Sequence, residues 1–540
     1  MSLTYQQAKL VKETIPILSS HGDLITTIFY RNLLNAQPSL SAIFNNANQL
    51  NGRQPRALTQ IILTFAQHIH RMSELAPILE RVCHKHVSLN ISPADYDIVG
   101  KYLLGAFSTV LGPTIFTTAV AEAWERAYNI LARMLSGREA QLYASLGDWV
   151  GFRPFRIMRK VQETRTRDVF SLYLVPVDGS MLPLPAFKPG QYVSLQIPVT
   201  GYEDVTTQTR QYSLSDKPRG DYYRITLKRE INANGGPGMV SSTLIDNYGI
   251  GDIVQLSHPT GDFFLDMENS GSSVPVVLIS AGVGVAPMIS ILNSLLAQVP
   301  TPPSTSSSSS SSSSSRINPI SSKNSIASSV QAASPSSTHS PVPSFFSRSR
   351  THSRAPSVPS LSPANRTASF SFSSSRLSRG SVDSTSTSSP EPEPGPKQEL
   401  AESIAATATL ANHVVAPQLP ACRPITWIHG SHADAAFDIY IRSIAHMRRN
   451  FHSAVFKTAP EAGDILGSDF NFTGRVDLDK ISDADLHLAY GAAEYFICGP
   501  EGFMLDVRKA LLRKGVDVSR IKCELFNTGD LLANAKWKGA

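Results

Sequence analysis

Three short motifs in this chain carry the residue types that hold flat, charged cofactors. Residues 210–213 (Arg-Gln-Tyr-Ser) place a fixed cation, an aromatic face and a hydroxyl side by side at the end of a predicted strand. An anionic, flat group such as a flavin needs these functions together. Residues 280–288 (SAGVGVAPM) form a Gly-rich turn after an apolar run, which lets the phosphates of a dinucleotide approach the backbone. Residues 498–500 (Cys-Gly-Pro) end another apolar run.

Histidine offers a different chemistry in the N-terminal part of the chain. His84 and His86 lie on one predicted helical stretch, and imidazole is a common metal ligand. A single histidine on a helix is more often a packing or surface residue. The spacing alone leaves open which of the two, if either, is a ligand.

The periodicity of apolar residues predicts three architectures along the chain. Residues 1–149 repeat apolar side chains at three- and four-residue spacing, which predicts an all-α domain. Ser92-Pro93-Ala94-Asp95 marks a helix start, because these residues suit the cap and the first turn. Residues 150–268 carry short β-rich runs between Gly-containing turns, which predict a small antiparallel barrel. In residues 269–540, continuous apolar strands alternate with helical stretches, as in an α/β domain with a parallel sheet.

A long Ser-rich segment interrupts the last domain. Residues 300–419 are mostly Ser, Pro and Thr and include a run of serines from Ser306 to Ser315. Such a segment buries too little apolar surface to offset the entropy of ordering it, so we expect a disordered insertion. Arginines three residues before a hydroxyl, as at Arg354 and Ser357, are typical of sites for basophilic kinases. The alternatives are an inert spacer and a segment regulated by a kinase partner.

Bulk composition limits the class of protein. At 540 residues the chain needs several domains, and its 41% hydrophobic content fits a soluble protein. No apolar stretch predicts a membrane span, and the N-terminus lacks the features of a signal peptide. Four cysteines without a CxxC pair favour a reducing compartment, so we expect a cytoplasmic location. The net charge of +6 comes largely from the Ser-rich insertion, which argues against nucleic-acid binding.

In their order and spacing, the three cofactor motifs resemble the flavin reductase family related to ferredoxin–NADP reductase. Motifs in the first domain are similar to those of flavohaemoglobins. They are Ile43-Phe44-Asn45, Asn51-Gly52-Arg53-Gln54, Lys85-His86, Tyr96-Asp97-Ile98-Val99-Gly100 and Arg138-Glu139-Ala140. The combined likeness implies a globin domain that binds haem, an FAD-binding barrel and an NAD(P)-binding α/β domain that contains the Ser-rich insertion.

The resemblance assigns residues to FAD and to the dinucleotide. It implies that Arg210 faces the pyrophosphate, Tyr212 packs on the isoalloxazine ring and Ser213 bonds near its N5. The other residues implied for FAD are Tyr192, Gln211, Gly236, Met239, Val240, Ser241 and Phe526. Those implied for NADH or NADPH are Gly282, Val283, Gly284, Val285, Ala286, Pro287, Cys498, Gly499 and Pro500. Ala286 stands where the family has Thr, and Lys457 is the one cation that suggests how a ribose phosphate is recognised.

On the proximal side of the haem, the resemblance implies that His86 is the ligand of the iron. Glu139 and Tyr96 are implied as its partners, as metal-bound imidazoles normally donate their other N–H. A carboxylate bonded to the imidazole pushes electron density toward iron, which favours oxygen activation over storage.

On the distal side, the resemblance implies that Tyr30 and Gln54 hydrogen-bond O₂ on the iron. Phe44 and Leu58 are implied in the haem pocket. Pro55 departs from the family pattern and would bend a helix anywhere beyond its first turn.

These implications describe a nitric oxide dioxygenase with haem b, FAD and NADH or NADPH. NAD(P)H reduces FAD, FAD reduces the haem iron, and haem-bound O₂ converts nitric oxide to nitrate. The flavin is needed because a hydride carries two electrons whereas haem accepts one. The implied partners are therefore small molecules. One alternative is an NAD(P)H-dependent reductase of peroxide, ferric chelate or quinone, and another is a haem gas sensor.

Overall fold

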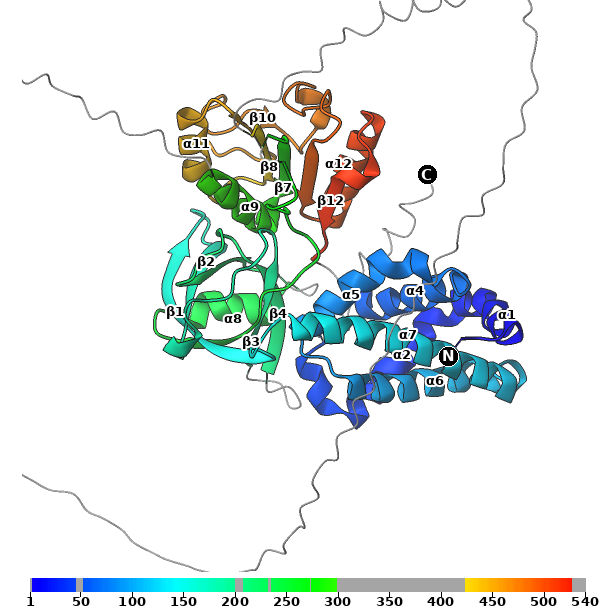
Figure 1. Cartoon of the computed structure of the whole chain (residues 1–540). Coiled ribbons are helices and arrows are strands. Elements are labelled where there is room, and N and C mark those ends of the chain that lie inside the picture. Colours follow the sequence, from blue (N-terminus) through cyan, green and yellow to red (C-terminus); the bar gives the residue numbers. More distant parts are fainter. Residues whose placement is uncertain are drawn as a thin grey trace, which may run out of the picture. The chain divides into compact units, whose positions relative to one another are not determined.

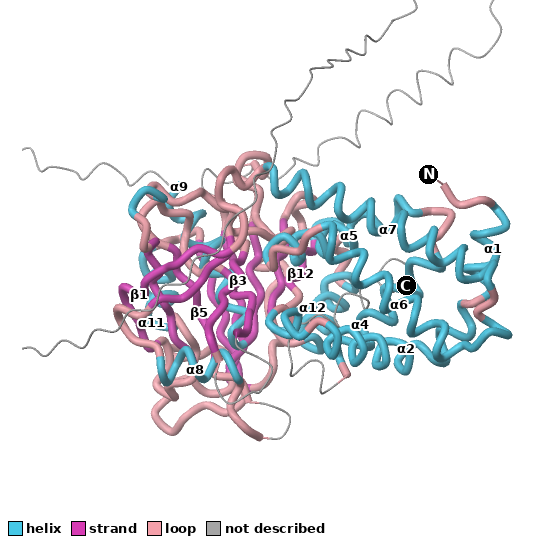
Figure 2. The backbone as a smooth tube through the Cα atoms, turned by 90° about the horizontal axis from the view of Figure 1, so that it is seen from below, coloured by secondary structure: helices cyan, strands magenta, loops and turns pink. Residues whose placement is uncertain are grey.

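The computed structural model describes most of the chain outside the Ser-rich insertion. The described residues are 2–44, 52–199, 207–231, 235–271, 273–298 and 423–526. They all belong to one compact unit. The insertion predicted at residues 300–419 lies outside the described residues. Helices alone make up the regular structure of the N-terminal part, whereas strands appear only after it (Figures 1 and 2).

The N-terminal part is the predicted all-α domain. Its helices are α1 (Tyr5–Glu13), α2 (Ile15–Ala36), α4 (Arg53–Gln67), α5 (Ala76–Ser88), α6 (Pro93–Ile115) and α7 (Thr118–Ala144), with 3₁₀ turns η1 (Pro38–Ala42) and η2 (Met72–Leu75). Helix α2 packs against α4 and α6, and α5 packs against α7. The core forms where their apolar faces meet, around Phe107 and Trp124. The predicted start of α6 is confirmed, because the Ser92 amide donates to the Asp95 carboxylate at 2.8 Å.

Among the described residues, α6 is the one helix long and apolar enough to cross a membrane by length and composition. Leu103, Phe107 and Leu111 of this helix lie in the core of the helical domain. Core helices pass the same test, so the feature is weak evidence for a span.

The second part is an antiparallel sheet. Its strands are β1 (Phe152–Gln162), β2 (Val169–Pro176), β3 (Tyr192–Pro198), β4 (Thr207–Ser213), β5 (Tyr223–Lys228) and β6 (Ile253–Ser257). The strand order is β4-β3-β6-β1-β2-β5, and a bridge between Leu214 and Ile225 joins the two ends. The sheet therefore closes as the barrel that the sequence predicts. Helix α8 (Met239–Asn247) packs against β4.

The third part has a parallel sheet, as predicted. Its strands are β7 (Val276–Ala281), β8 (Ile425–Ser431), β9 (Phe451–Lys457), β10 (Phe472–Thr473), β11 (Glu494–Cys498) and β12 (Ile521–Glu524). The helices of this part are α9 (Val285–Gln298), α11 (Asp438–Met447) and α12 (Glu501–Arg513), with 3₁₀ turns at Gly282–Gly284, Leu478–Lys480 and Val518–Arg520.

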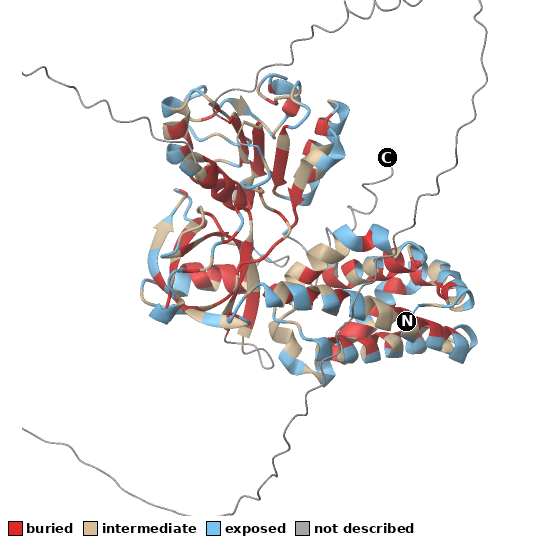
Figure 3. Cartoon of the chain, in the orientation of Figure 1, coloured by how far each residue is buried: buried red, intermediate tan, exposed pale blue. Residues whose placement is uncertain are grey.

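The strand order of this sheet fixes where a ligand can bind. The order is β10-β9-β8-β7-β11-β12, so the chain runs outward from β7 to β10 and then returns to the other side of β7. The strands form the buried centre of the domain (Figure 3). Ligands of such sheets bind outside the carboxyl ends of the strands where the order reverses. Here that place lies between the ends of β7 and β11.

Candidate functional site

His86 on α5 lines a cavity of about 380 Å³ in the helical domain. The walls of the cavity are mainly apolar. They include Phe44, Leu58, Ile61, Val99 and Leu103. His86 Nδ1 lies 2.8 Å from Glu139 Oε1 and 2.9 Å from the Tyr96 hydroxyl. No described residue hydrogen-bonds the other ring nitrogen, Nε2.

The contacts at Nδ1 fix the tautomer of His86. Glu139 is 2% exposed and also accepts a hydrogen bond of 2.6 Å from the Tyr96 hydroxyl. Burial and the Glu139 carboxylate raise the pKa of the Tyr96 phenol, so Tyr96 stays protonated and donates. Because a carboxylate only accepts, Nδ1 carries the imidazole proton and Nε2 keeps its lone pair for a ligand in the cavity.

His84, the other histidine that the sequence left open, faces a different surface. Two residues along a helix rotate a side chain by about 200°. His84 Nδ1 lies 2.6 Å from Thr260 Oγ1 and accepts a 3.2 Å hydrogen bond from the Gly261 amide. The cavity wall includes His86 but not His84. Of the two histidines, only His86 therefore lies where it could bind a group inside the cavity.

Tyr30 on α2 and Gln54 on α4 line the same cavity. Burial raises the pKa of the Tyr30 phenol, and the Gln54 side chain partly opposes this shift. Gln54 Oε1 is buried without a hydrogen-bond partner among the described residues. Helix α4 begins at Arg53, so Pro55 falls in the first turn, where its missing N–H costs little. The side chains that face His86 thus include one phenol donor and one amide with unused capacity.

The cavity continues from His86 to the motif at residues 210–213, because Arg210, Gln211 and Phe526 also line it. The Arg210 guanidinium donates to Gln208 Oε1 at 2.9 Å and to the Thr209 carbonyl at 2.7 Å. Among the described residues it has no carboxylate partner, and burial lowers its pKa. A mostly buried cation without a counter-ion is costly, so this position fits an anionic group.

Two further features of the barrel fit the same anion. Ser213 Oγ is buried and has no hydrogen-bond partner among the described residues. Helix α8 begins at Met239 with Gly238 as its cap, and no side chain of the described residues caps its first amides. Free amides at a helix start favour phosphate, so the predicted residues Gly236, Met239, Val240 and Ser241 lie where a pyrophosphate could bind. Tyr192 and Tyr212 lie on the neighbouring strands β3 and β4.

The Gly-rich loop after β7 meets the end of β11. Gly282 has a φ of +55°, a conformation that L side chains rarely adopt. A Cβ at Gly284 would clash with the backbone of Cys498 and Gly499. Val285, Ala286 and Pro287 open helix α9, and Ala286 is buried, so the residue that replaces the family's Thr packs instead of bonding. The residues predicted to bind the dinucleotide therefore converge at the place where the strand order reverses.

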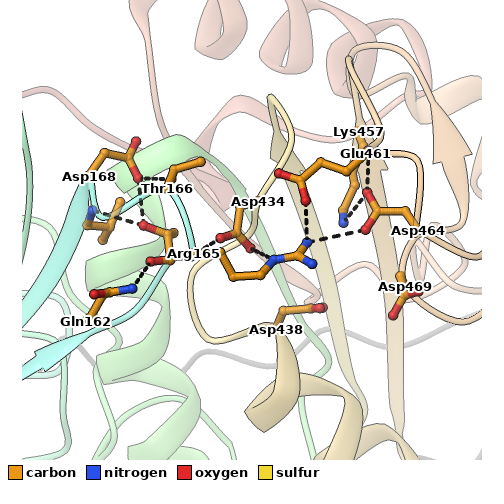
Figure 4. Close-up of polar contacts among 12 residues, drawn as sticks. Gln162, Arg165, Thr166, Asp168, Asp434, Asp438, Lys457, Glu461, Asp464 and Asp469 are labelled. Atoms are coloured by element: carbon orange, nitrogen blue, oxygen red, sulfur yellow. Dashed lines mark hydrogen bonds and ion pairs between the residues drawn. The ribbon is translucent and has the colours of Figure 1, made fainter.

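Lys457 at the end of β9 already has a partner. Its ammonium lies 2.9 Å from Asp464 Oδ2, and the two side chains are 2% and 3% exposed. Arg165, from the hairpin between β1 and β2, contacts Glu461 at 3.1 Å and Asp464 at 3.5 Å (Figure 4). A buried ammonium that is paired with a carboxylate does not present a free charge to a ribose phosphate. The structure thus contradicts the suggestion that Lys457 recognises one.

Glu524 is the acidic residue of the Glu-x-Phe stretch that contains Phe526, but the sequence assigned it no role of its own. It is buried at the end of β12, two residues before Phe526. Burial raises the pKa of Glu524 to about 8, the Asp262 carboxylate adds to the shift, and the Arg81 guanidinium opposes it. Nothing in the Cys-Glu-Leu-Phe string indicates such a shift, because its main cause is burial.

We expect the Glu524→Gln variant to be more stable than the wild type at alkaline pH. The folded-state pKa is raised, so the stability is fully present below the unfolded pKa of about 4.5 and is lost as pH rises toward 8. The loss is at most a few kcal/mol, since one pKa unit corresponds to about 1.4 kcal/mol. Thermal unfolding of both proteins without added cofactor, from pH 4 to 9, measures this loss of stability. Parallel curves across this range would contradict a raised pKa.

Known proteins resemble this chain in sequence and in fold. A family model described as Globin matches residues 27–135. The chain is 33% identical over 525 residues to the flavohemoprotein of Bordetella parapertussis, across 96% of this chain and 97% of that protein. It is 45% identical over 299 residues to the flavohemoprotein of Chromobacterium violaceum, across 54% of this chain and 72% of that protein. The crystal structure of flavohemoglobin from Malassezia yamatoensis with bound FAD and heme matches with a TM-score of 0.63 and 21% identity, across 98% of this chain and all of that one.

Proposed function

The chain belongs to the flavohaemoglobin family, and from that premise we propose that it is a nitric oxide dioxygenase that uses haem, FAD and NAD(P)H. The observation that carries the proposal is the single cavity that joins His86, Tyr30 and the flavin motif at Gln211. A binding globin needs only the first two of these residues. A cavity that also reaches a flavin-type motif supports an electron supply to the haem site, and hence turnover.

The residues present fit all three groups. Haem fits the apolar cavity through Nε2 of His86, FAD fits the barrel through Arg210 and the start of α8, and the dinucleotide fits the loop at Gly284. When bound, these groups supply two-electron acceptance from NAD(P)H, delivery of single electrons, and an iron at which O₂ and nitric oxide react.

The chain's own residues orient and protect this chemistry. Glu139 and Tyr96 hold the proton of His86 on Nδ1, which keeps Nε2 directed to the cavity as a strong donor. Tyr30 stays protonated because burial raises its pKa, so it offers a hydrogen bond to a diatomic ligand. The apolar side chains of Phe44 and Leu58 exclude water from the same space.

The experiment that tests the proposal measures nitrate against NADH consumed. Purified protein loaded with haem and FAD receives NADH, O₂ and nitric oxide, and we expect one nitrate for each nitric oxide consumed. NADH consumption without nitrate would assign the enzyme to another acceptor. Slow NADH consumption with all gases present would favour a gas sensor.

We expect the Tyr30→Phe variant to form nitrate about tenfold more slowly than the wild type. The substitution removes one donor from the cavity, and a hydrogen bond to a partly charged acceptor is worth roughly 1.5–3 kcal/mol. Flavin reduction by NADH should not change, because Tyr30 lies in the helical domain, apart from the dinucleotide loop. Stopped-flow measurements of flavin bleaching and nitrate formation give the two rates. Nitrate formation at the wild-type rate would remove Tyr30 from the mechanism.

A further inference from the structure

One face of α5 attaches the helical domain to the barrel and to strand β12 of the parallel sheet. Arg81, His84 and Ser88 recur at a spacing that places them on one side of the helix. The Arg81 guanidinium lies 3.0 Å from Asp262 Oδ2 and donates to the Cys523 carbonyl at 3.4 Å. The bonds of His84 to Thr260 and Gly261 continue this face toward Ser88.

Ser88 is the most buried member of this face, with 2% exposure. Its hydroxyl donates to the Lys85 carbonyl at 2.8 Å. It also accepts from Ser194 Oγ of β3 and from Gln211 Nε2 of β4, each at 2.9 Å. A serine hydroxyl has one proton and two lone pairs, so every hydrogen-bonding position of Ser88 is used.

These contacts connect the two ends of the electron path. Ser88 follows His86 by two residues on α5, and Gln211 lies between Arg210 and Tyr212 on β4. Gln211 and His86 line the same cavity. One hydroxyl therefore holds the His86 helix against the strand that carries the flavin motif.

We propose that Ser88 is a positioning residue for electron transfer from flavin to haem. With both groups bound, one electron would pass from the reduced flavin to ferric iron, and Ser88 would exchange neither an electron nor a proton. Ser88 acts by keeping α5 and β4 in contact, so that the two bound groups remain close. The inference rests on the electron path of the proposed function but not on nitric oxide as the substrate.

The test uses the holoprotein with the Ser88→Ala substitution, mixed with NADH without oxygen. The variant leaves the buried Ser194 hydroxyl and the half-buried Gln211 amide without their acceptor. We expect flavin reduction at the wild-type rate and haem reduction about tenfold slower. A tenfold change corresponds to about 1.4 kcal/mol of the free energy that holds α5 against β4. Haem reduction at equal rates in variant and wild type overturns the inference. A wild type whose haem stays oxidised overturns the proposed function instead.

A second readout is independent of activity. If the contact weakens, backbone amides of 87–89 and 211–213 should exchange hydrogen about tenfold faster in Ser88→Ala than in the wild type, with or without bound cofactors. Unchanged exchange in both segments overturns the positioning role.

Two other substitutions separate this role from a general loss of stability. Ser171 is also fully buried and hydrogen-bonds Thr226 at 2.8 Å, but it lies inside the barrel. We expect Ser171→Ala to reduce its haem at the wild-type rate, and an equal slowing there overturns a specific role for Ser88. If Ser88→Ala does not fold, Ser88→Cys fills the site with a slightly larger thiol that is only a weak acceptor, so it should also slow haem reduction. A wild-type rate in that variant overturns the inference.

Discussion

The His86→Ala variant is expected to lose its haem completely while it keeps its flavin. His86 lines the cavity, no described residue hydrogen-bonds its Nε2, and Glu139 and Tyr96 hold the ring at Nδ1. The remaining cavity wall is mainly apolar, so no neighbouring side chain replaces an iron–imidazole bond. The absorption spectrum of the purified variant should show flavin bands and no Soret band. A full Soret band at wild-type stoichiometry would mean that another residue holds the iron.

His84→Ala is the matched control for this experiment. Both histidines lie on α5 and both are partly buried, with side chains 12% and 30% exposed for His84 and His86, but His84 bonds the barrel residues Thr260 and Gly261. The control removes an imidazole of the same helix without removing one from the cavity. We therefore expect it to retain haem, and loss of haem from both variants would indicate a general opening of α5 and not the loss of a ligand.

The local spacing of apolar residues was sufficient to predict the architecture, because this spacing differs between the three parts of the chain. Residues 150–268, where the sequence predicts short strands, contain β1 to β6, and the helix start predicted at Ser92 opens α6. Apolar repeats report which faces are buried, and burial decides the type of element. The closure of the barrel between Leu214 and Ile225 is not visible in this way, because it depends on a pairing between separate strands.

The predicted site residues were harder to place because their roles depend on the direction in which each side chain points. The spacing of His84 and His86 did not distinguish a barrel contact from a cavity ligand, whereas a rotation of about 200° along the helix separates them. Lys457 has the right charge for a phosphate, but Asp464 from a later loop neutralises it. Ser88 has no motif of its own, and only the approach of β3 and β4 gives its hydroxyl two donors. A repeat of polar residues at 81, 84 and 88 was the one available signal of a second contact face on α5.

The Arg210→Met variant is expected to bind FAD roughly 10- to 100-fold more weakly and, without FAD, to be more stable than the wild type. Arg210 is mostly buried without a carboxylate partner among the described residues, so the flavin-free protein bears the cost of an uncompensated cation. An anionic ligand relieves that cost, and a charge-assisted hydrogen bond contributes roughly 1.5–3 kcal/mol. Methionine keeps much of the volume and removes the charge. Flavin titration and thermal unfolding of the flavin-free protein measure the two effects.

The opposite signs of these two effects distinguish a binding role for Arg210 from a structural one. A cation that supported the barrel would lower both FAD affinity and flavin-free stability when it was removed. Arg156→Met is a suitable control, because Arg156 is exposed on β1 of the same sheet and donates to the Gly251 carbonyl. It should change neither quantity appreciably. If Arg210→Met bound FAD as tightly as Arg156→Met, the start of α8 would have to hold the pyrophosphate alone. The presence of Arg210 in the motif at residues 210–213 would then need another explanation.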